Sequence, residues 1–316
     1  EAPIPFMMSS AGWGVFDNTT VRSYFDVARY DKERLLIYNT APGADFYVMV
    51  GGSMPQTLGL YTSLTGRAYV LPRWMYGLSF GGHMQENQFE MMDDAVRFRT
   101  EKVPCDVMWI EPQWMSKYYD FSTEKSWNYK LFPPEGYWVE KQFPKHEWKT
   151  SFVGRLHGLG YKLGLWLCID HDQSIVEEDI IAAREGRPQS GKEHWFDHLT
   201  NFMDQGVDGF KLDECDSSDN TGGWSFPLTS RFPSGLDGEQ YHSLFGTLYA
   251  QSVMQALGDT KTLSEVRNMG ALAASYPFVL YSDLYDHKDF IRGVVQSGFS
   301  GILWTPEVRH AKDKDD

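Results

Sequence analysis

The stretch HWFDHLTNFMDQGVDGFKLDECD, residues 194–216, contains the pattern on which the fold prediction depends. Its first part, HWFDHLTNFMDQG at 194–206, has the apolar spacing of an amphipathic helix and ends with a glycine. GFKLD at 209–213 is a short apolar run that ends in an acid, which predicts a buried strand. A helix followed at once by a buried strand is typical of the βαβ unit, from which parallel sheets are built.

The same alternation recurs from about residue 74 onward. Helical patterns such as NQFEMMDDAVRFRTE at 87–101 and WKTSFVGRLHGLG at 148–160 lie between apolar runs. The predicted strands are 74–80, 106–111, 162–169, 209–213, 262–266, 278–283 and 301–305. Strands that alternate with amphipathic helices predict parallel βαβ units, and eight of them would close a (β/α)8 TIM barrel. Because seven strands are present, we expect an α/β barrel that lacks its last strand in this chain.

Residues 1 to about 66 have a different pattern, of short aromatic or β-branched runs separated by Gly, Asn and Asp. Such spacing predicts the strands of a β-sandwich, followed by a short helix at 54–66. We therefore expect the C-terminal part of a β-sandwich domain at 1–68 and the catalytic barrel at 69–316. The opening EAPIPFMMSS has neither a starting Met nor a signal-like region, so we expect the chain to come from a longer one.

Composition limits the class of partner. The formal net charge of −14 argues against a nucleic-acid binder, which needs clustered Lys and Arg. No apolar run approaches about 18 residues, so no membrane span is expected. Aromatic residues make up 15% of the chain, which suits stacking on neutral, hydroxyl-rich ligands, although a large core also uses them. The oligomeric state is not predicted.

Cofactor and metal sites are not expected either. Cys105, Cys168 and Cys215 form no CxxC pair or zinc spacing, so we expect buried free thiols, which slightly favours a cytoplasmic location. CIDHDQS at 168–174 places two acids and a histidine side by side. Adjacent residues rarely converge on one ion without a distant ligand, so this run does not predict a metal site.

Ionisable residues at the ends of the predicted strands are the candidates for a site, because a barrel forms its active site at the C-terminal ends of its strands. Any one of them could be a loop acid or a helix cap, but six strand ends with such residues favour a site. They are Glu111, Asp170, Asp213, Arg267, Asp283 and Glu307.

Two carboxylates on different strand ends are the minimum for cleaving a glycosidic bond, and Asp213 and Asp283 fit that pairing best. Strand alternation puts Lys211 on the same side as Asp213, where its charge would keep Asp213 ionised. Asp283 ends the aromatic run FVLYSD, whose apolar surroundings would favour the protonated form that a proton donor needs. Asp208, before the strand, is expected to fix a glycine turn, and Glu214 to lie on the opposite face from Asp213.

Several motifs together resemble glycoside hydrolase family 31, the retaining α-glycosidases that include α-glucosidases and α-xylosidases. LYTSLTGRAYVLPRWMYG at 60–77 resembles the junction between the family's sandwich and barrel. VPCDVMWIEPQWM at 103–115 with YYDF at 118–121 resembles the second barrel strand, and GVDGFKLDECD at 206–216 the nucleophile segment. The run from Arg267 to Asp283 matches, without a gap, the segment from the sugar-binding arginine to the acid/base.

The resemblance implies a role for each matching residue. Asp213 would be the nucleophile that forms a β-linked glycosyl-enzyme, and Asp283 the acid/base. Arg267 and Trp166 would line the first sugar subsite, and Glu111 stands where most members have an Asp that binds ring hydroxyls. The remaining substrate-binding candidates are Asp170, Lys211, Asp216, Trp304 and Glu307. The expected partner is an oligosaccharide or glycoside, and no cofactor is implied.

Two departures from the family affect the choice of sugar. Glu111 moves the carboxylate outward by about one C–C bond, and a subsite that reads hydroxyls by hydrogen bonds is sensitive to that change. The family's S-H-D-I-G-G-F is replaced by TPEVRH at 305–310, where Glu307 and Arg309 either contact an unusual sugar or pair with each other. An α-glucoside, α-galactoside, α-xyloside or N-acetylgalactosaminide therefore stays open, as do transglycosylation and a catalytically silent sugar-binding role.

Overall fold

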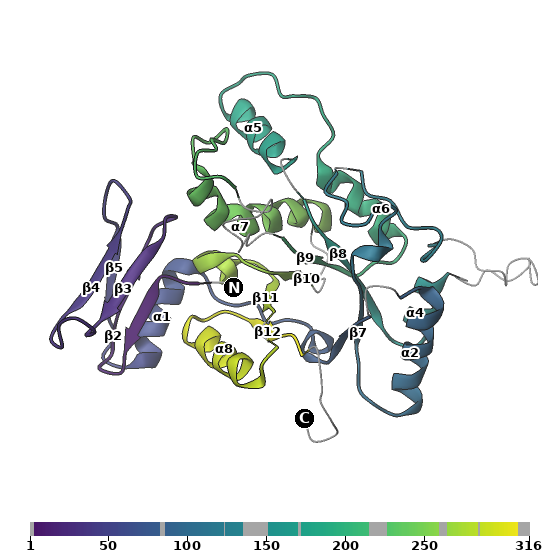
Figure 1. Cartoon of the computed structure of the whole chain (residues 1–316), viewed down its shortest axis with the longest axis horizontal. Coiled ribbons are helices and arrows are strands. Elements are labelled where there is room, and N and C mark those ends of the chain that lie inside the picture. The colour runs from purple at the N-terminus through teal and green to yellow at the C-terminus, as the bar shows by residue number, and fades with distance from the viewer. Residues whose placement is uncertain are drawn as a thin grey trace, which may run out of the picture. The chain divides into compact units, whose positions relative to one another are not determined.

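The computed structural model describes residues 3–82, 86–122, 124–134, 151–169, 172–214, 226–258, 264–283 and 285–308 (Figure 1). The strands are β1 (Phe6–Ser9), β2 (Trp13–Asp17), β3 (Ser23–Val27), β4 (Leu35–Asn39), β5 (Phe46–Val50), β6 (Ser79–Gly81), β7 (Val107–Ile110), β8 (Lys162–Leu167), β9 (Gly209–Leu212), β10 (Ser264–Val266), β11 (Phe278–Ser282) and β12 (Trp304–Pro306). The α-helices are α1 (Met54–Thr65), α2 (Gln88–Thr100), α4 (Phe152–Gly158), α5 (Asp172–Arg184), α6 (Leu199–Asp204), α7 (Gly238–Leu257) and α8 (His287–Phe299). Short 3-10 helices are η1 (Arg73–Tyr76), η2 (Pro112–Trp114), η3 (Trp195–His198) and η4 (Gly270–Ser275).

Contacts divide the chain into two compact units, which are described separately. The first unit contains Glu1–Tyr69, Cys215–Leu248 and Val266–Asp316, and the second contains Val70–Glu214 and Tyr249–Glu265. This division differs from the predicted sandwich at 1–68 and barrel at 69–316, and that domain boundary stays a prediction.

In the first unit, the N-terminal residues form short strands, as predicted, and these strands pair antiparallel. β1, β2 and β5 make a three-stranded sheet with Phe6 opposite Phe16, and β3 pairs with β4 in a separate ladder. The predicted helix is present as α1, and its fully buried Tyr61 stacks on Phe6 with ring centroids 3.9 Å apart. Burial of that phenol raises the pKa of Tyr61 to about 12. The helix ends at Gly66, whose φ of 100° suits a residue without a side chain.

The first unit also contains β11 and β12, which pair in parallel with Leu280 opposite Trp304. Helix α8 connects them, as the βαβ prediction requires. Gly293 of α8 lies against the ring of Trp304, because a Cβ at that glycine would come within 2.8 Å of the indole. The Trp304 ring therefore lies against α8, and a substrate-binding role for this residue stays a prediction.

In the second unit, β6, β7, β8 and β9 lie next to one another in chain order, and each strand pairs in parallel with the next. The strand order of the whole parallel sheet, β6 to β12, also follows the chain order. These strands confirm the predicted α/β barrel architecture with seven strands. The first strand is shorter than predicted, since η1 occupies Arg73–Tyr76 and β6 starts at Ser79. The turn starts at Pro72, whose carbonyl accepts a hydrogen bond from Met75 at 2.9 Å.

Helices α2 and α4 lie side by side in the second unit (Figure 1). The start of α2 is fixed by a capping box in which Asn87 and Glu90 exchange side-chain and backbone hydrogen bonds. Three aromatic rings of this unit meet edge to face with centroids 5.0–5.8 Å apart, those of Trp114, Trp127 and Phe202. Trp114 also donates its indole N–H to the carbonyl of Trp166 at 2.7 Å, so the aromatic core is tied to the end of β8.

Two predictions about residue classes can be compared with the described residues. Cys105 and Cys168 are free and buried, as predicted, and Cys215 lies outside the described residues. Of the helices in the described part of the chain, none combines the length and apolar character that crossing a membrane requires.

Candidate active site

Asp213 follows β9 directly and is almost fully buried, with 6% of its surface exposed. Each carboxylate oxygen accepts a hydrogen bond, Oδ2 from the Trp166 indole N–H and Oδ1 from the Glu214 backbone N–H, both at 2.7 Å. The Asp213 N–H donates to the carbonyl of Leu167 at 2.9 Å, which ties its backbone to β8. Two N–H donors on a buried carboxylate stabilise its ionised form and fix its direction.

The backbone after Asp213 leaves the strand conformation at once. Glu214 has a φ of 56°, in the left-handed region that non-glycine residues rarely adopt. The prediction that Glu214 alternates to the opposite face assumed extended backbone, so its geometric basis is wrong at this residue. The turn instead directs the Glu214 N–H at the Asp213 carboxylate.

Glu111 and Lys211 form an ion pair at neighbouring strand ends, with Lys211 Nζ 3.2 Å from Glu111 Oε1. The Lys211 side chain is only 8% exposed, so the pair is held away from most solvent. Sequence reasoning placed this lysine beside Asp213, which stays a prediction, and the structure shows that Glu111 is one of its partners. A Cβ on Gly81 would be 3.7 Å from the same Glu111 oxygen, so the β6 end leaves room beside the pair.

The register shows which side chains share a face of this sheet. Trp109 pairs with Gly164 and Gly164 with Gly209, and two residues further along Trp166 pairs with Lys211. Alternation along each strand therefore puts these rows on the same face. The Trp109 indole covers Gly164, since a Cβ there would come within 2.0 Å of the ring. This face therefore has one layer in which the Trp109 indole covers Gly164, and a neighbouring layer that contains the charged residues Glu111 and Lys211.

Tyr119 is a neighbour of the site that sequence reasoning did not single out. Its ring meets Trp166 edge to face with centroids 5.0 Å apart, and its φ is 52°. Burial, followed by the charges of the neighbouring groups, raises the pKa of Tyr119 to about 12; in decreasing order of effect these neighbours are Tyr118, Glu214, Asp213 and Glu111. The hydroxyl is therefore a neutral donor among carboxylates. The available signal was its place in YYDF, directly after the second barrel strand.

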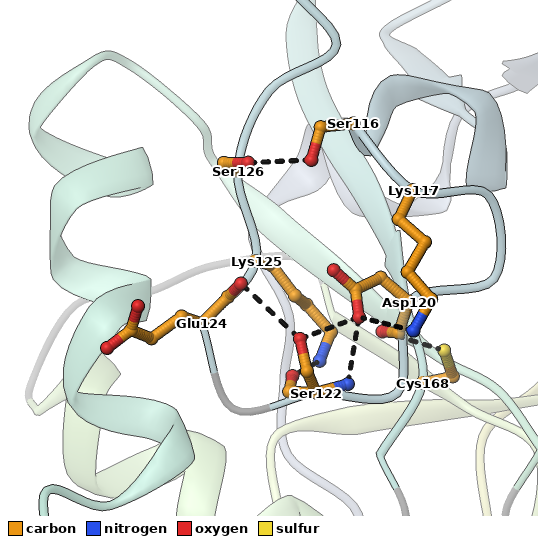
Figure 2. A network of polar contacts seen from close by, with 8 residues as sticks. All are labelled: Ser116, Lys117, Asp120, Ser122, Glu124, Lys125, Ser126 and Cys168. Atoms are coloured by element: carbon orange, nitrogen blue, oxygen red, sulfur yellow. Dashed lines mark hydrogen bonds and ion pairs between the residues drawn. The ribbon is translucent and has the colours of Figure 1, made fainter.

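The loop that carries Tyr119 is held by a polar network around Asp120 (Figure 2). Asp120 Oδ1 accepts hydrogen bonds from the backbone N–H and hydroxyl of Ser122 at 2.9 and 2.6 Å, and Lys117 Nζ is 3.9 Å away. Buried Lys125 donates to the Ser122 carbonyl at 2.7 Å. The Cys168 thiol donates to the Asp120 carbonyl at 3.3 Å, and burial raises the pKa of that thiol. The loop after β7 is thereby fastened to the first residue after β8.

Asp208 lies at the opposite, N-terminal end of β9. It accepts hydrogen bonds from Lys162 Nζ at 2.7 Å, His157 Nε2 at 2.8 Å and the Leu163 N–H at 3.0 Å. Burial by itself would raise the pKa of Asp208, but these hydrogen bonds outweigh it and hold the pKa below its usual value. The structure thus gives Asp208 an architectural role, as predicted, although it joins β8 and α4 to β9 and does more than fix a turn.

In the first unit, Asp283 and Arg267 form a two-point ion pair. Arg267 Nη1 lies 2.9 Å from Asp283 Oδ2 and Nη2 lies 3.3 Å from Oδ1. The guanidinium also lies 5.0 Å from the centre of the Tyr281 ring. The Asp283 side chain is 45% exposed and contacts a cation, so the apolar surroundings that the sequence suggested for it are wrong.

The predicted site residues therefore fall into three groups. The second unit brings together Glu111, Trp166, Lys211 and Asp213, and the first unit pairs Arg267 with Asp283. Glu307 follows β12 and is half-buried. Asp170, Asp216 and Arg309 lie outside the described residues.

Comparisons with known proteins agree with this architecture. An alpha-xylosidase of Saccharolobus solfataricus is 25% identical over 230 residues, covering 69% of this chain and 29% of the relative. An isomaltosyltransferase of Sporosarcina globispora is 23% identical over 327 residues, covering 85% and 28%. A family 31 dextranase of Flavobacterium johnsoniae, complexed with isomaltotriose, has the same fold, with a TM-score of 0.74 at 19% identity over 97% of this chain and 40% of that one.

The chain thus spans less than half the length of these relatives. The family model for the TIM-barrel domain of glycosyl hydrolases family 31 matches residues 68–308, which is most of the chain. This chain belongs to glycoside hydrolase family 31.

Proposed function

We propose that this chain carries the active site of a retaining α-glycosidase that hydrolyses terminal α-glycosidic bonds of oligosaccharides or glycosides. The observation that carries the proposal is the setting of Asp213, a buried strand-end carboxylate with one N–H donor on each oxygen. A nucleophilic carboxylate must be ionised and aimed, and these two hydrogen bonds serve both needs. Asp283 is the complementary acid/base, and it directly follows β11, which is also a buried strand.

The mechanism needs two displacements. Asp213 attacks the anomeric carbon and forms the C–O bond of a β-linked glycosyl-enzyme, while the bond to the leaving oxygen breaks and Asp283 gives that oxygen its proton. Asp283, now a carboxylate, takes a proton from water as the water attacks the same carbon and releases Asp213. Barrel folds bring the C-terminal ends of their strands to one face, and retaining enzymes place the two carboxyls about 5–5.5 Å apart.

The Glu111–Lys211 pair is the proposed hydroxyl-binding element. Its carboxylate accepts hydrogen bonds from sugar hydroxyls and its ammonium donates to them, so both polarities are offered from one place. The pair is largely buried, and a sugar lacking a matched hydroxyl would leave one of the two charges unsatisfied. Arg267 adds a further donor at the other unit's strand end.

A panel of p-nitrophenyl α-glycosides tests the activity and names the sugar: glucoside, galactoside, xyloside and N-acetylgalactosaminide. The named relatives include an alpha-xylosidase, which makes the xyloside the first substrate to try. Glu111→Gln should reduce kcat/KM by about 10- to 100-fold on the best substrate, since one hydroxyl contact in a buried polar site contributes on the order of 1.5–3 kcal/mol. Turnover of none of the four glycosides would contradict this part of the proposal.

Separate substitutions test the two carboxylates. Asp213→Ala should abolish turnover of every substrate, whereas Asp283→Ala should spare substrates with very good leaving groups, which need little protonation. A fluorinated glycosyl fluoride should trap a covalent adduct that peptide mapping assigns to Asp213. Glu178→Gln, an exposed acid on α5, is the matched control and should keep full activity. An adduct on another residue, or equal loss on both substrate types in Asp283→Ala, would overturn the corresponding role.

Transglycosylation is the second candidate, because one relative is an isomaltosyltransferase. The same glycosyl-enzyme would then be released by an acceptor sugar in place of water. Product analysis with and without an added acceptor separates the two reactions, since a hydrolase gives free sugar in both and a transferase gives a new glycoside only with the acceptor. A catalytically silent sugar binder would give no trapped adduct at all.

A further inference from the structure

We propose that Glu124, Glu193 and His198 bind one divalent transition-metal ion, with Zn²⁺ as the fitting ion. The three side chains each offer one ligand atom, and these atoms all lie within 4.8 Å of one another. The site lies among the loops of the second unit and uses none of the residues placed in the sugar site. One imidazole nitrogen and two carboxylate oxygens are ligands that Zn²⁺ takes in proteins.

The spacing of the ligand atoms suits a tetrahedral ion. His198 Nε2 is 3.5 Å from Glu193 Oε2. Ligand atoms about 2.0–2.1 Å from a tetrahedral Zn²⁺ are about 3.3–3.4 Å from each other, so this pair is already at the required separation. The Glu124 carboxylate lies within 4.8 Å of both atoms and provides the third ligand of the set. Mg²⁺ and Ca²⁺ fit less well, because they prefer six or more oxygen ligands.

His198 provides an observation that is independent of the spacing. Its Nε2 is buried and has no hydrogen-bond partner within the described residues. Buried polar nitrogens are nearly always satisfied by a protein group, a water or a metal ion, and the two neighbouring carboxylates suit a metal ion. A surface ion pair would explain the Glu193 contact, but it would not explain why a third ligand group converges on the same place.

Glu193 and His198 are held in place before any ion binds. They flank a capping box in which the His194 N–H donates to Asp197 Oδ2 at 3.0 Å. The preceding loop is anchored at Asp179, whose carboxylate accepts hydrogen bonds from the Ser190 N–H at 2.6 Å and from His194 Nε2 at 2.9 Å. These hydrogen bonds hold the backbone around two of the three ligand residues in place, which lowers the entropy cost of binding.

Glu124 comes from the loop that also carries Tyr119. The Ser122 hydroxyl, which donates to Asp120 Oδ1 at 2.6 Å, lies 3.4 Å from the Glu124 carbonyl, and Figure 2 shows the Glu124 side chain extending out of the network toward a neighbouring helix. Three residues later, Trp127 donates to Gln205 Oε1 at 2.6 Å and joins this loop to the end of α6. A metal ion at Glu124 would also join this loop to Glu193 and to His198 of η3, so its role is structural.

The test uses the full chain without a polyhistidine tag, freed of metal with EDTA. Isothermal titration with ZnCl2 should show one tight site, and the thermal unfolding midpoint should rise with Zn²⁺ concentration by mass action. Glu124→Gln and His198→Gln should each weaken Zn²⁺ binding by about tenfold or more and abolish the thermal shift. Loss of a group that only hydrogen-bonds to a metal ligand already reduces metal affinity by about 10- to 100-fold, and loss of the ligand itself costs more. MgCl2 and CaCl2 should give neither effect.

Two results would overturn the proposal. One is the absence of a tight site in the unsubstituted chain, and the other is Zn²⁺ binding that survives unchanged in both variants, which would place the ion elsewhere. Glu178→Gln, an exposed acid on α5, controls for the loss of one surface carboxyl and should bind Zn²⁺ as the unsubstituted chain does. Since both variants leave the strand-end carboxylates in place, glycosidase activity with the ion removed reports on the proposed function independently.

Discussion

Glu86 is a fully buried carboxyl whose replacement by glutamine should make the protein less sensitive to alkaline pH. Its carboxyl lies directly against Gly82, where an added Cβ would overlap Oε2, and neither oxygen has a hydrogen-bond partner among the described residues. Burial, followed by the charges of Asp94 and Glu90, raises the pKa of Glu86 from 4.5 to about 8. The folded protein therefore holds this carboxyl protonated at pH 7, whereas the unfolded chain ionises it.

The size of the effect follows from that difference in pKa. A folded-state pKa above the unfolded value means that the stability present below about pH 4.5 is lost as the pH rises toward about 8. At pH 7 the loss amounts to about 3 kcal/mol, at about 1.4 kcal/mol for each pH unit. Glutamine is neutral in both states and carries no such dependence. Its buried amide costs about 1–3 kcal/mol, so the slope with pH is the measurement that decides, more than the absolute difference.

Urea unfolding at pH 5, 6, 7 and 8 measures this slope. The free energy of unfolding of Glu86→Gln, relative to the unsubstituted chain, should increase by about 1.4 kcal/mol per pH unit across most of this range. Glu178→Gln, measured in parallel, shows what loss of an exposed carboxyl does under the same conditions. A difference between Glu86→Gln and the unsubstituted chain that stays constant with pH would refute the reasoning, because Glu86 would then be ionised and paired in the fold.

Three further substitutions test the contacts described above. Trp166→Phe keeps the aromatic ring but removes the 2.7 Å hydrogen bond to the proposed nucleophile, and kcat should fall by about 10- to 100-fold with little change in KM, as steady-state kinetics would show. Gly164→Ala forces a methyl into an indole ring and should cost about 1–3 kcal/mol in urea unfolding, whereas Gly158→Ala, with open space around it, should cost nothing or stabilise. Asp208→Asn should lower stability at pH 7 by about 1–3 kcal/mol, and this deficit should shrink as the pH falls below about 4, because an acid with a lowered pKa stabilises the fold only while it is ionised.

The strand pattern was predictable because buried strands and amphipathic helices leave long, regular signals. Predicted strands at 106–111, 162–169 and 209–213 correspond to β7, β8 and β9 within one or two residues. The predicted strand at 74–80 came out shorter, since a proline-led turn competes with extended backbone over its first half. Local hydrogen bonds decide between this turn and extended backbone, and the spacing of apolar residues carries no sign of them.

The site was predictable where it depends on position along a strand, and not where it depends on partners. The strand-end rule found Glu111 and Asp213, which both act on Tyr119 in the second unit. It could not tell that Lys211 pairs with Glu111, or that Asp283 pairs with Arg267 in partly exposed surroundings, because both are choices among several reachable charges. The contact of the Trp304 ring with Gly293 of α8 depends on how the helix packs on the strand, which the sequence alone does not reveal.

The indole of Trp109 over Gly164 also constrains how this sequence can vary. A larger residue fits at position 164 only if a smaller side chain has first replaced the indole of Trp109. Substitution of Trp109 must therefore precede substitution of Gly164. Because this layer lies next to the Glu111–Lys211 layer, any such exchange also alters the support beneath the charged pair. Selection for a different sugar therefore also acts on Trp109 and Gly164, two positions outside the proposed sugar site.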